Sequence, residues 1–179
     1  PDIVVQQGAL EAMVEYLKLH EDVGLVGPQL SNPDGSIQYS CAHFPTILTP
    51  LYRRTPLGRL PQGQQAVRSY IMIDADHTAT QEVDWLLGAC LMFKRKHIKT
   101  VGFLDERFFL YFEDTDFCRR FWEHHLKVVY LPHAHMIHYH RRMSANESIL
   151  HALCSRPMRA HIASGFKYFW KYCNRALPR

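Results

Sequence analysis

The run Tyr111-Phe112-Glu113-Asp114-Thr115-Asp116 decides how this chain of 179 residues is interpreted. It places three carboxylates at the start of a segment, Glu113 to about His125, in which Phe117 and Phe121 recur at helical spacing. Acidic residues in a first helical turn interact favourably with the positive end of the helix dipole. The run therefore predicts a helix that begins near Glu113.

These three carboxylates also suggest chemistry. Because they share one helical turn beside aromatic residues, at least one of them should point into apolar surroundings. Burial there raises the pKa of a carboxyl group and suits its carboxylate to accept a proton. The alternative is structural: the carboxylates cap the helix and pair with Arg119 and Arg120 at helical spacing. The residues alone leave both interpretations open.

Other segments show clear periodicity or turn chemistry. The pattern predicts, in chain order, a helix at Gly8–His20, a buried strand at Val23–Val26, a turn at Asn32–Ser36 returning into Ile37–Cys41, a buried strand at Val83–Phe93, and two strands at Lys127–Leu131 and Ala134–Tyr139 separated by Pro132.

Residues 45–80 show little periodicity. They hold Pro45, Pro50, Pro56 and Pro61 together with four arginines. We expect a long, irregular segment with at most one short helix. Loops of this length are usually functional or mobile.

The C-terminal region is basic and amphipathic. From about Pro157 to Asn174, apolar residues form one helical stripe with Arg and Lys beside it: Ile162, Phe166, Phe169 and Cys173, flanked by Arg159, Lys167 and Lys171. Residues 141–179 carry eight Lys and Arg against the single Glu147. Such asymmetry indicates an anionic partner, either a membrane surface or a phosphate group, with a solvated helix packed on the domain as the alternative.

Composition sets outer bounds. With 47% hydrophobic and 21% charged residues, the chain can bury one sizeable core. No stretch has the roughly 18 uninterrupted apolar residues of a membrane-spanning helix, and the N-terminus lacks a signal-peptide pattern. The five cysteines form no C-x-x-C pair, which favours a reducing compartment. We therefore expect a cytoplasmic protein, either soluble or peripheral on the inner face of the membrane.

Four histidines alternate near the end of the last strand: His133, His135, His138 and His140. His138 and His140 share a face, where they could reach a metal ion. The alternative is that each is structural or exposed to solvent. A zinc site made from these histidines alone is weakly indicated, because the H-E-x-x-H spacing is absent.

Several runs together resemble, in order, the second half of bacterial family-2 glycosyltransferases, particularly rhamnosyltransferase-like members. The matching runs are spread along nearly the whole chain: Gly24–Pro28, Asn32–Gln38, Val83–Cys90, Val101–Phe109, Glu113–Arg120, Val128–His138 and Ser164–Tyr172.

This resemblance implies an α/β fold equivalent to the second half of a GT-A (Rossmann-like) domain: a mixed sheet flanked by helices, then a basic amphipathic C-terminal helix. Residues 1–140 would be the partial catalytic domain, on the acceptor side, and residues 141–179 a basic helical tail. The strand and loops that hold the nucleotide base and ribose should precede Pro1. One departure is His124-His125-Leu126, where the family usually ends the helix in glycine.

The resemblance also implies roles for individual residues. Asp114 would be the base that deprotonates the acceptor hydroxyl, while Glu113 and Asp116 orient the acceptor or brace the loop. A pocket for the acceptor or the sugar would be lined by Trp85, Gly88 and Ala89, with an ordinary core strand as the alternative.

A metal site is implied as well. Asp2 would be the last member of a metal-binding motif, and His138 would supply a further ligand. Carboxylate, imidazole and phosphate oxygens suit magnesium or manganese. Arg141 and Arg142 would meet the pyrophosphate of the donor.

The function implied for the full-length enzyme is transfer of a sugar, with rhamnose as the family's suggestion, from a nucleotide-sugar donor to a saccharide or lipid-linked acceptor during cell-surface polysaccharide synthesis. The transfer would be metal-dependent and would invert the anomeric configuration. The alternative is an inactive transferase fragment that serves as an interaction or membrane-surface module. Nucleic-acid binding is disfavoured, because the basic residues cluster in one short tail.

Overall fold

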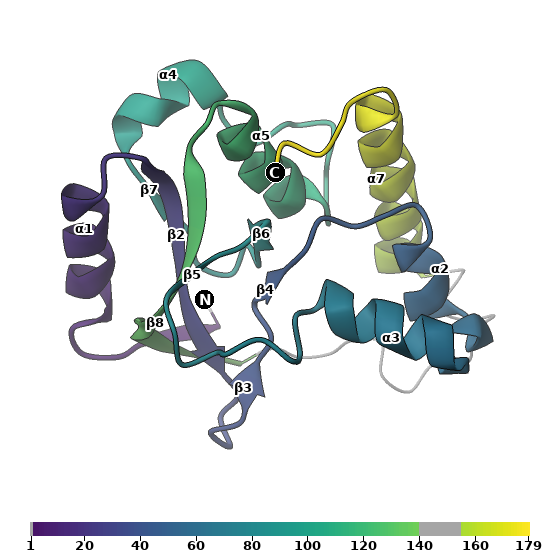
Figure 1. The fold of residues 1–179 in the computed structure, drawn as a ribbon, viewed down its shortest axis with the longest axis horizontal. Helices are drawn as coiled ribbons and strands as arrows, with labels where there is room; N and C mark the ends of the chain where they lie inside the picture. Colours follow the sequence, from purple (N-terminus) through teal and green to yellow (C-terminus); the bar gives the residue numbers. More distant parts are fainter. Residues whose placement is uncertain (1, 140–154) are drawn as a thin grey trace.

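A mixed, curled β-sheet lies between helices in this α/β fold (Figure 1), as expected. A computed structural model describes residues 2–139 and 155–179. Its elements are β1 (Ile3–Val5), α1 (Ala9–Leu19), β2 (Val23–Ser31), β3 (Ile37–Gln38), β4 (Cys41–Ala42), α2 (Thr49–Arg54), η1 (Pro56–Arg59), α3 (Pro61–Tyr70), β5 (Gln81–Glu82), β6 (Trp85–Leu86), β7 (Met92–Phe93), η2 (Arg95–His97), α4 (Ile98–Val101), α5 (Glu113–Glu123), β8 (Lys127–His138) and α7 (Arg156–Tyr172).

Two long parallel strands, β2 and β8, form the centre of the sheet, and short antiparallel strands extend it. The sheet order is β1-β8-β2-β3, with β5 paired to β8 and β7 paired to β2. Side chains alternate between the two faces, as strand geometry requires. Val128 and Tyr130 pack towards α5, whereas Val129 and Leu131 pack towards α1, so the sheet separates two apolar cores.

Most predicted elements are confirmed. The helices expected near Gly8–His20 and Glu113–His125 are α1 and α5, and the turn at Asn32–Ser36 joins β2 to β3 as an antiparallel pair. The departure from glycine after α5 also has a structural counterpart: His125 takes a left-handed conformation, with φ 56°. A side chain there is strained, because the left-handed region favours glycine.

The prediction of a long, irregular segment with at most one short helix at residues 45–80 is wrong. The segment contains α2, η1 and α3, and each of these three begins with proline at its first or second position. Proline is well tolerated there, because the first amides of a helix need no intrahelical partner. The prolines that suggested a loop therefore start helices.

Two strand predictions need correction. The predicted strand Val83–Phe93 is interrupted: β6 pairs with β4 and β7 pairs with β2, so the chain changes partners around Gly88. Conversely, β8 is one strand, because Pro132 is accommodated by a shift in its pairing with β2. Proline lacks the amide hydrogen that a regular ladder needs, so it is found at such irregularities.

The C-terminal helix α7 is confirmed, but its predicted apolar stripe is not the face that packs. The buried residues of α7 are Ser164, Gly165, Tyr168 and Tyr172, whereas Phe166 and Cys173 are exposed. Tyr168 and Tyr172 join Phe108 and Phe112 in a third apolar cluster that attaches α7 to the body. In the described part of the chain, no helix has the length and hydrophobicity required to cross a membrane.

Candidate active site

Asp114 lies in the first turn of α5, almost fully buried, beneath an exposed backbone corner at Gly88. The Gly88 amide donates a hydrogen bond to Asp114 Oδ2 at 3.0 Å, and the Thr115 amide donates one to Oδ1 at 2.7 Å. Burial raises the pKa of this carboxyl group, and the hydrogen bonds oppose the shift. Asp114 is thus fixed in place by two backbone amides, and its carboxyl group has a raised pKa.

Gly88 allows this close approach. A Cβ atom added at position 88 would lie 3.2 Å from the Cβ of Asp114 and 3.4 Å from its Oδ2. Such distances would require the carboxylate to move by a few tenths of an ångström. The small residue therefore keeps the corner open above Asp114.

The turn that leads into α5 is strained. Tyr111 and Phe112 are consecutive and both left-handed, with φ 66° and 67°. Non-glycine residues in this region cost about 1–2 kcal/mol each, and such strain gathers at functional sites. The ring of Phe112 is held 5.2 Å from that of Tyr168, and it contacts the space beside Gly165. Packing against α7 thus holds the turn that aims Asp114.

Glu113 is half-buried beside Asp114. Its Oε2 is buried and has no hydrogen-bond partner among the described residues. Burial, and then the charge of Asp114, raise the pKa of Glu113. The two neighbouring carboxyl groups thus both favour the protonated form more than usual.

Asp116 has a different environment. It is fully buried, and its carboxylate accepts hydrogen bonds from Arg120 Nε at 2.8 Å, Lys171 Nζ at 2.5 Å and the Tyr172 hydroxyl at 2.8 Å. Lys171 also contacts Asp105. The expected pairing of a carboxylate with Arg120 is therefore found at Asp116, which links α5 to α7.

The three residues predicted to line a pocket have different surroundings. Gly88 is hydrogen-bonded to Asp114. The Trp85 indole donates a hydrogen bond to the His43 carbonyl at 2.8 Å, and its ring is 6.3 Å from that of Tyr70. Ala89 packs with the apolar core on the α1 side of the sheet.

Four residues near the site were missed by the sequence analysis: Arg53, Arg54, Tyr70 and His161. The first three come from α2 and α3, inside the segment predicted to be irregular, and His161 comes from α7. Arg53 lies over the buried ring of Tyr70, at 5.3 Å. Burial raises the pKa of Tyr70 to about 12, and the charge of Asp114 contributes. The sequence signal that could have identified these helices is the proline at the first or second position of α2, α3 and α7.

The predicted metal ligands Asp2 and His138 do meet. Asp2 immediately precedes β1, which pairs with β8, and Asp2 Oδ2 lies 3.5 Å from His138 Nε2. Over residues 2–139 and 155–179, no cluster of three or more His, Cys, Asp or Glu forms that could hold a metal ion. Arg141 and Arg142 lie outside the described residues, as does the predicted domain boundary at residue 140.

Comparison with known proteins finds relatives of the same class that the sequence motifs resemble. No family model matches the chain. It is 26% identical over 159 residues to the N-acetylglucosaminyl-diphospho-decaprenol L-rhamnosyltransferase of Mycobacterium tuberculosis strains CDC 1551 and H37Rv, which covers 84% of this chain and 48% of that protein. It is 31% identical over 86 residues to rhamnosyltransferase WbbL of Escherichia coli K12, which covers 48% of this chain and 30% of that protein.

The chain therefore spans about half the length of the first curated relatives it matches. The similarities support a glycosyltransferase relationship, with rhamnosyltransferases as the relatives found.

Proposed function

We propose that this chain is part of an inverting glycosyltransferase that uses a nucleotide-sugar, with Asp114 as the general base. The observation that carries the proposal is a buried carboxylate of raised proton affinity beneath an open glycine corner. The relatives are named as rhamnosyltransferases, and one name includes a decaprenol-linked diphosphate sugar. Transfer of rhamnose to a saccharide or lipid-linked acceptor, in cell-surface polysaccharide synthesis, is the corresponding proposal for the whole protein.

The chemistry proposed is a single displacement. The acceptor hydroxyl gives its proton to the Asp114 carboxylate while its oxygen bonds to the anomeric carbon of the donor. The bond from that carbon to the diphosphate oxygen breaks, and the nucleoside diphosphate leaves with the electron pair. Attack from the opposite side inverts the anomeric configuration. A positioned base of this kind contributes typically a factor of about 10² to 10⁴ in rate.

We propose that Asp2 and His138 supply two ligands to a divalent metal ion, Mg²⁺ or Mn²⁺, whose other ligands would come from the donor diphosphate. Gln38 Nε2 donates to the Asn32 side chain and to the His138 carbonyl, so Gln38 Oε1 is the acceptor of a hydrogen bond from His138 Nδ1 at 2.9 Å. That bond fixes the orientation of the imidazole ring, whose Nε2 faces Asp2. When bound, the ion would stabilise negative charge on the leaving diphosphate.

The proposed metal site has a direct test. Calorimetric titration with nucleoside diphosphates and nucleotide-sugars, with and without Mn²⁺, should show metal-dependent binding that is lost in Asp2→Ala and His138→Ala. Asp114→Asn should retain this binding and lose turnover. An Asp114→Asn variant with wild-type turnover would exclude Asp114 as the base. No binding to the wild-type chain would favour the alternative, an inactive fragment acting as an interaction module.

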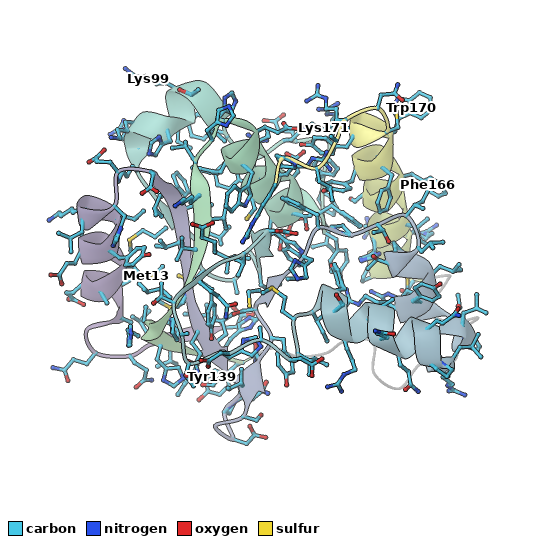
Figure 2. The ribbon with its side chains drawn as sticks, in the orientation of Figure 1. Met13, Lys99, Tyr139, Phe166, Trp170 and Lys171 are labelled. Carbon is cyan, nitrogen blue, oxygen red and sulfur yellow. The ribbon has the colours of Figure 1, made fainter. Side chains whose placement is uncertain are left out.

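A membrane surface is the second partner proposed, on the basis of exposed aromatic residues. The four most exposed large apolar side chains of the described residues, each at least 75% exposed, are Phe103, Phe109, Phe166 and Trp170. Figure 2 shows the last two on α7, at the right-hand edge of the view. Helix α7 contains no acidic residue. Aromatic side chains beside Arg and Lys suit the interface of an anionic bilayer.

Vesicle flotation tests this surface. The wild-type chain should bind phosphatidylglycerol vesicles more strongly than phosphatidylcholine vesicles. Phe166→Ser with Trp170→Ser should lose the binding, because both side chains are exposed and their loss leaves the fold intact. Leu19→Ser is the matched control: Leu19 is 72% exposed at the end of α1, far from α7 in Figure 1. Equal binding by the double variant would exclude this surface.

A further inference from the structure

Helix α2 lies beside the N-terminal half of α7 (Figure 1). A narrow cleft of about 20 Å³ lies between them, next to the strained turn before Asp114. Its walls include Arg53 and Arg54 from α2, His161 from α7, and the rings of Tyr70 and Phe112. The cleft is thus built from α2, α3, the turn before α5, and α7. The side chains of Arg53, Arg54 and His161 bring nitrogen atoms that can donate hydrogen bonds. The cleft is separate from the Asp2 and His138 pair, which lies where the start of β1 meets the end of β8.

The charge in this cleft is not balanced within the described residues. No carboxylate among them forms an ion pair with Arg53 or Arg54, whereas Arg119 and Arg120 nearby are paired with Glu123 and Asp116. Adjacent guanidinium groups repel each other, and burial followed by the charge of Arg53 lowers the pKa of Arg54. An anion between them would relieve that repulsion.

The pKa of His161 responds to the charges of Arg53 and Arg54. Its ring lies 4.7 Å from the ring of Tyr111 and 5.4 Å from that of Phe112. Burial, followed by the charges of Arg54 and Arg53, lowers the pKa of His161 to about 4. A bound anion would add an opposite charge and raise that pKa, so His161 is a built-in probe of occupancy.

The cleft is also close to the proposed base. Phe112 is two residues before Asp114, and the Tyr70 ring under Arg53 lies within electrostatic reach of the Asp114 carboxylate. Because the cleft has a volume of only about 20 Å³, an anionic group would sit at its mouth, where Arg53 and Arg54 are exposed, with its neighbouring atoms near Asp114. Guanidinium groups recognise phosphate oxygens through paired, charge-assisted hydrogen bonds.

We propose that Arg53, Arg54 and His161 bind a phosphate or diphosphate group, and that this group belongs to the acceptor. The second part rests on the proposed function, since Asp114 takes its proton from the acceptor. The same chemistry occurs in the diphosphate of the donor nucleotide, so the two sources must be separated experimentally. The first part requires neither donor nor turnover.

The test of the anion site uses inorganic pyrophosphate without metal. Titration of the wild-type chain, followed by the ¹H–¹³C NMR signal of the His161 ring as a function of pH, should show the pKa of His161 rising on binding. Arg53→Gln with Arg54→Gln should weaken calorimetric binding by roughly tenfold to a hundredfold, because one or more charge-assisted hydrogen bonds are lost.

The matched control is Arg68→Gln on α3, where the arginine is exposed and pairs with Asp74; binding should not change. Circular dichroism checks the fold of each variant, and the shift of His161 in the wild-type chain needs no variant at all. An unchanged pKa of His161 with saturating pyrophosphate, or equal binding by the double variant, would overturn the anion site.

A second comparison identifies the source of the phosphate. We expect Arg53→Gln with Arg54→Gln to weaken binding of a short-chain lipid diphosphate sugar, and to leave Mn²⁺-dependent binding of a nucleoside diphosphate unchanged. The reverse pattern would assign the cleft to the donor and overturn the acceptor assignment. Intact pyrophosphate binding by a wild-type protein that shows no sugar transfer would count against the proposed function alone.

Discussion

Replacing Asp116 by asparagine tests whether this carboxylate is a structural link between α5 and α7. Asp116 is fully buried, and the side chains of Arg120 and Lys171 that contact it are only 13% and 15% exposed. Removing one partner of a buried ion pair typically costs about 3–5 kcal/mol. Lys171 keeps its contact with Asp105, and Arg120 keeps two backbone carbonyls, so we expect the lower end, about 3 kcal/mol.

For a chain of this size, about 3 kcal/mol corresponds to a fall in Tm of roughly 6–12 °C. Urea denaturation followed by circular dichroism measures the free energy of unfolding directly. The control is Asp74→Asn, which removes the partner of the exposed Arg68 and should cost less than about 1 kcal/mol. An Asp116→Asn variant that is as stable as wild type but inactive would refute the structural role, and would place Asp116 among the residues that act on substrate.

Three further predictions concern single side chains. Burial lowers the pKa of His161 in the folded chain to about 4, from an ordinary 6.5, so the unfolded chain binds a proton at higher pH than the folded chain does. The free energy of unfolding should therefore fall as pH drops from 6.5 to 4, and His161→Phe should remove this contribution to the slope of urea midpoints across that range. His125→Gly should raise the free energy of unfolding by about 0.5–1 kcal/mol, because glycine relieves the left-handed strain; a lower urea midpoint would contradict this. Gly88→Ala should displace Asp114 and lower kcat by about tenfold or more with little change in Tm, and unchanged kcat would show that the corner above Asp114 is not used.

The sequence was sufficient to predict the elements with strong periodicity. The apolar run at the start of β2 and the helical spacing of Phe117 and Phe121 depend on local geometry and were interpreted correctly, whereas β8 was predicted as two strands. The segment of α2 and α3 was not, because the same prolines that break a helix interior also begin helices.

Tertiary contacts account for what the sequence could not show. Periodicity identified an apolar stripe on α7, but it cannot decide which face is buried. The buried face is instead Ser164, Tyr168 and Tyr172, whose hydroxyl groups find partners: Ser164 donates to the Leu110 carbonyl, and Tyr172 donates to Asp116. Likewise, the proximity of Arg53 to Tyr70 and Asp114 depends on how α2 and α3 fold back, which no local pattern specifies.

Helix α7 packs one face on the body and exposes the other, and this arrangement allows a thermodynamic linkage. Its inner face holds Phe112 through Tyr168 and holds Asp116 through Lys171 and Tyr172, while its outer face presents Phe166 and Trp170. Any ligand that binds the outer face only when α7 is docked adds its binding free energy to the docked state. A bilayer in contact with that face would therefore raise the population of chains in which the turn before Asp114 is ordered. Catalytic competence and surface attachment would then rise and fall together.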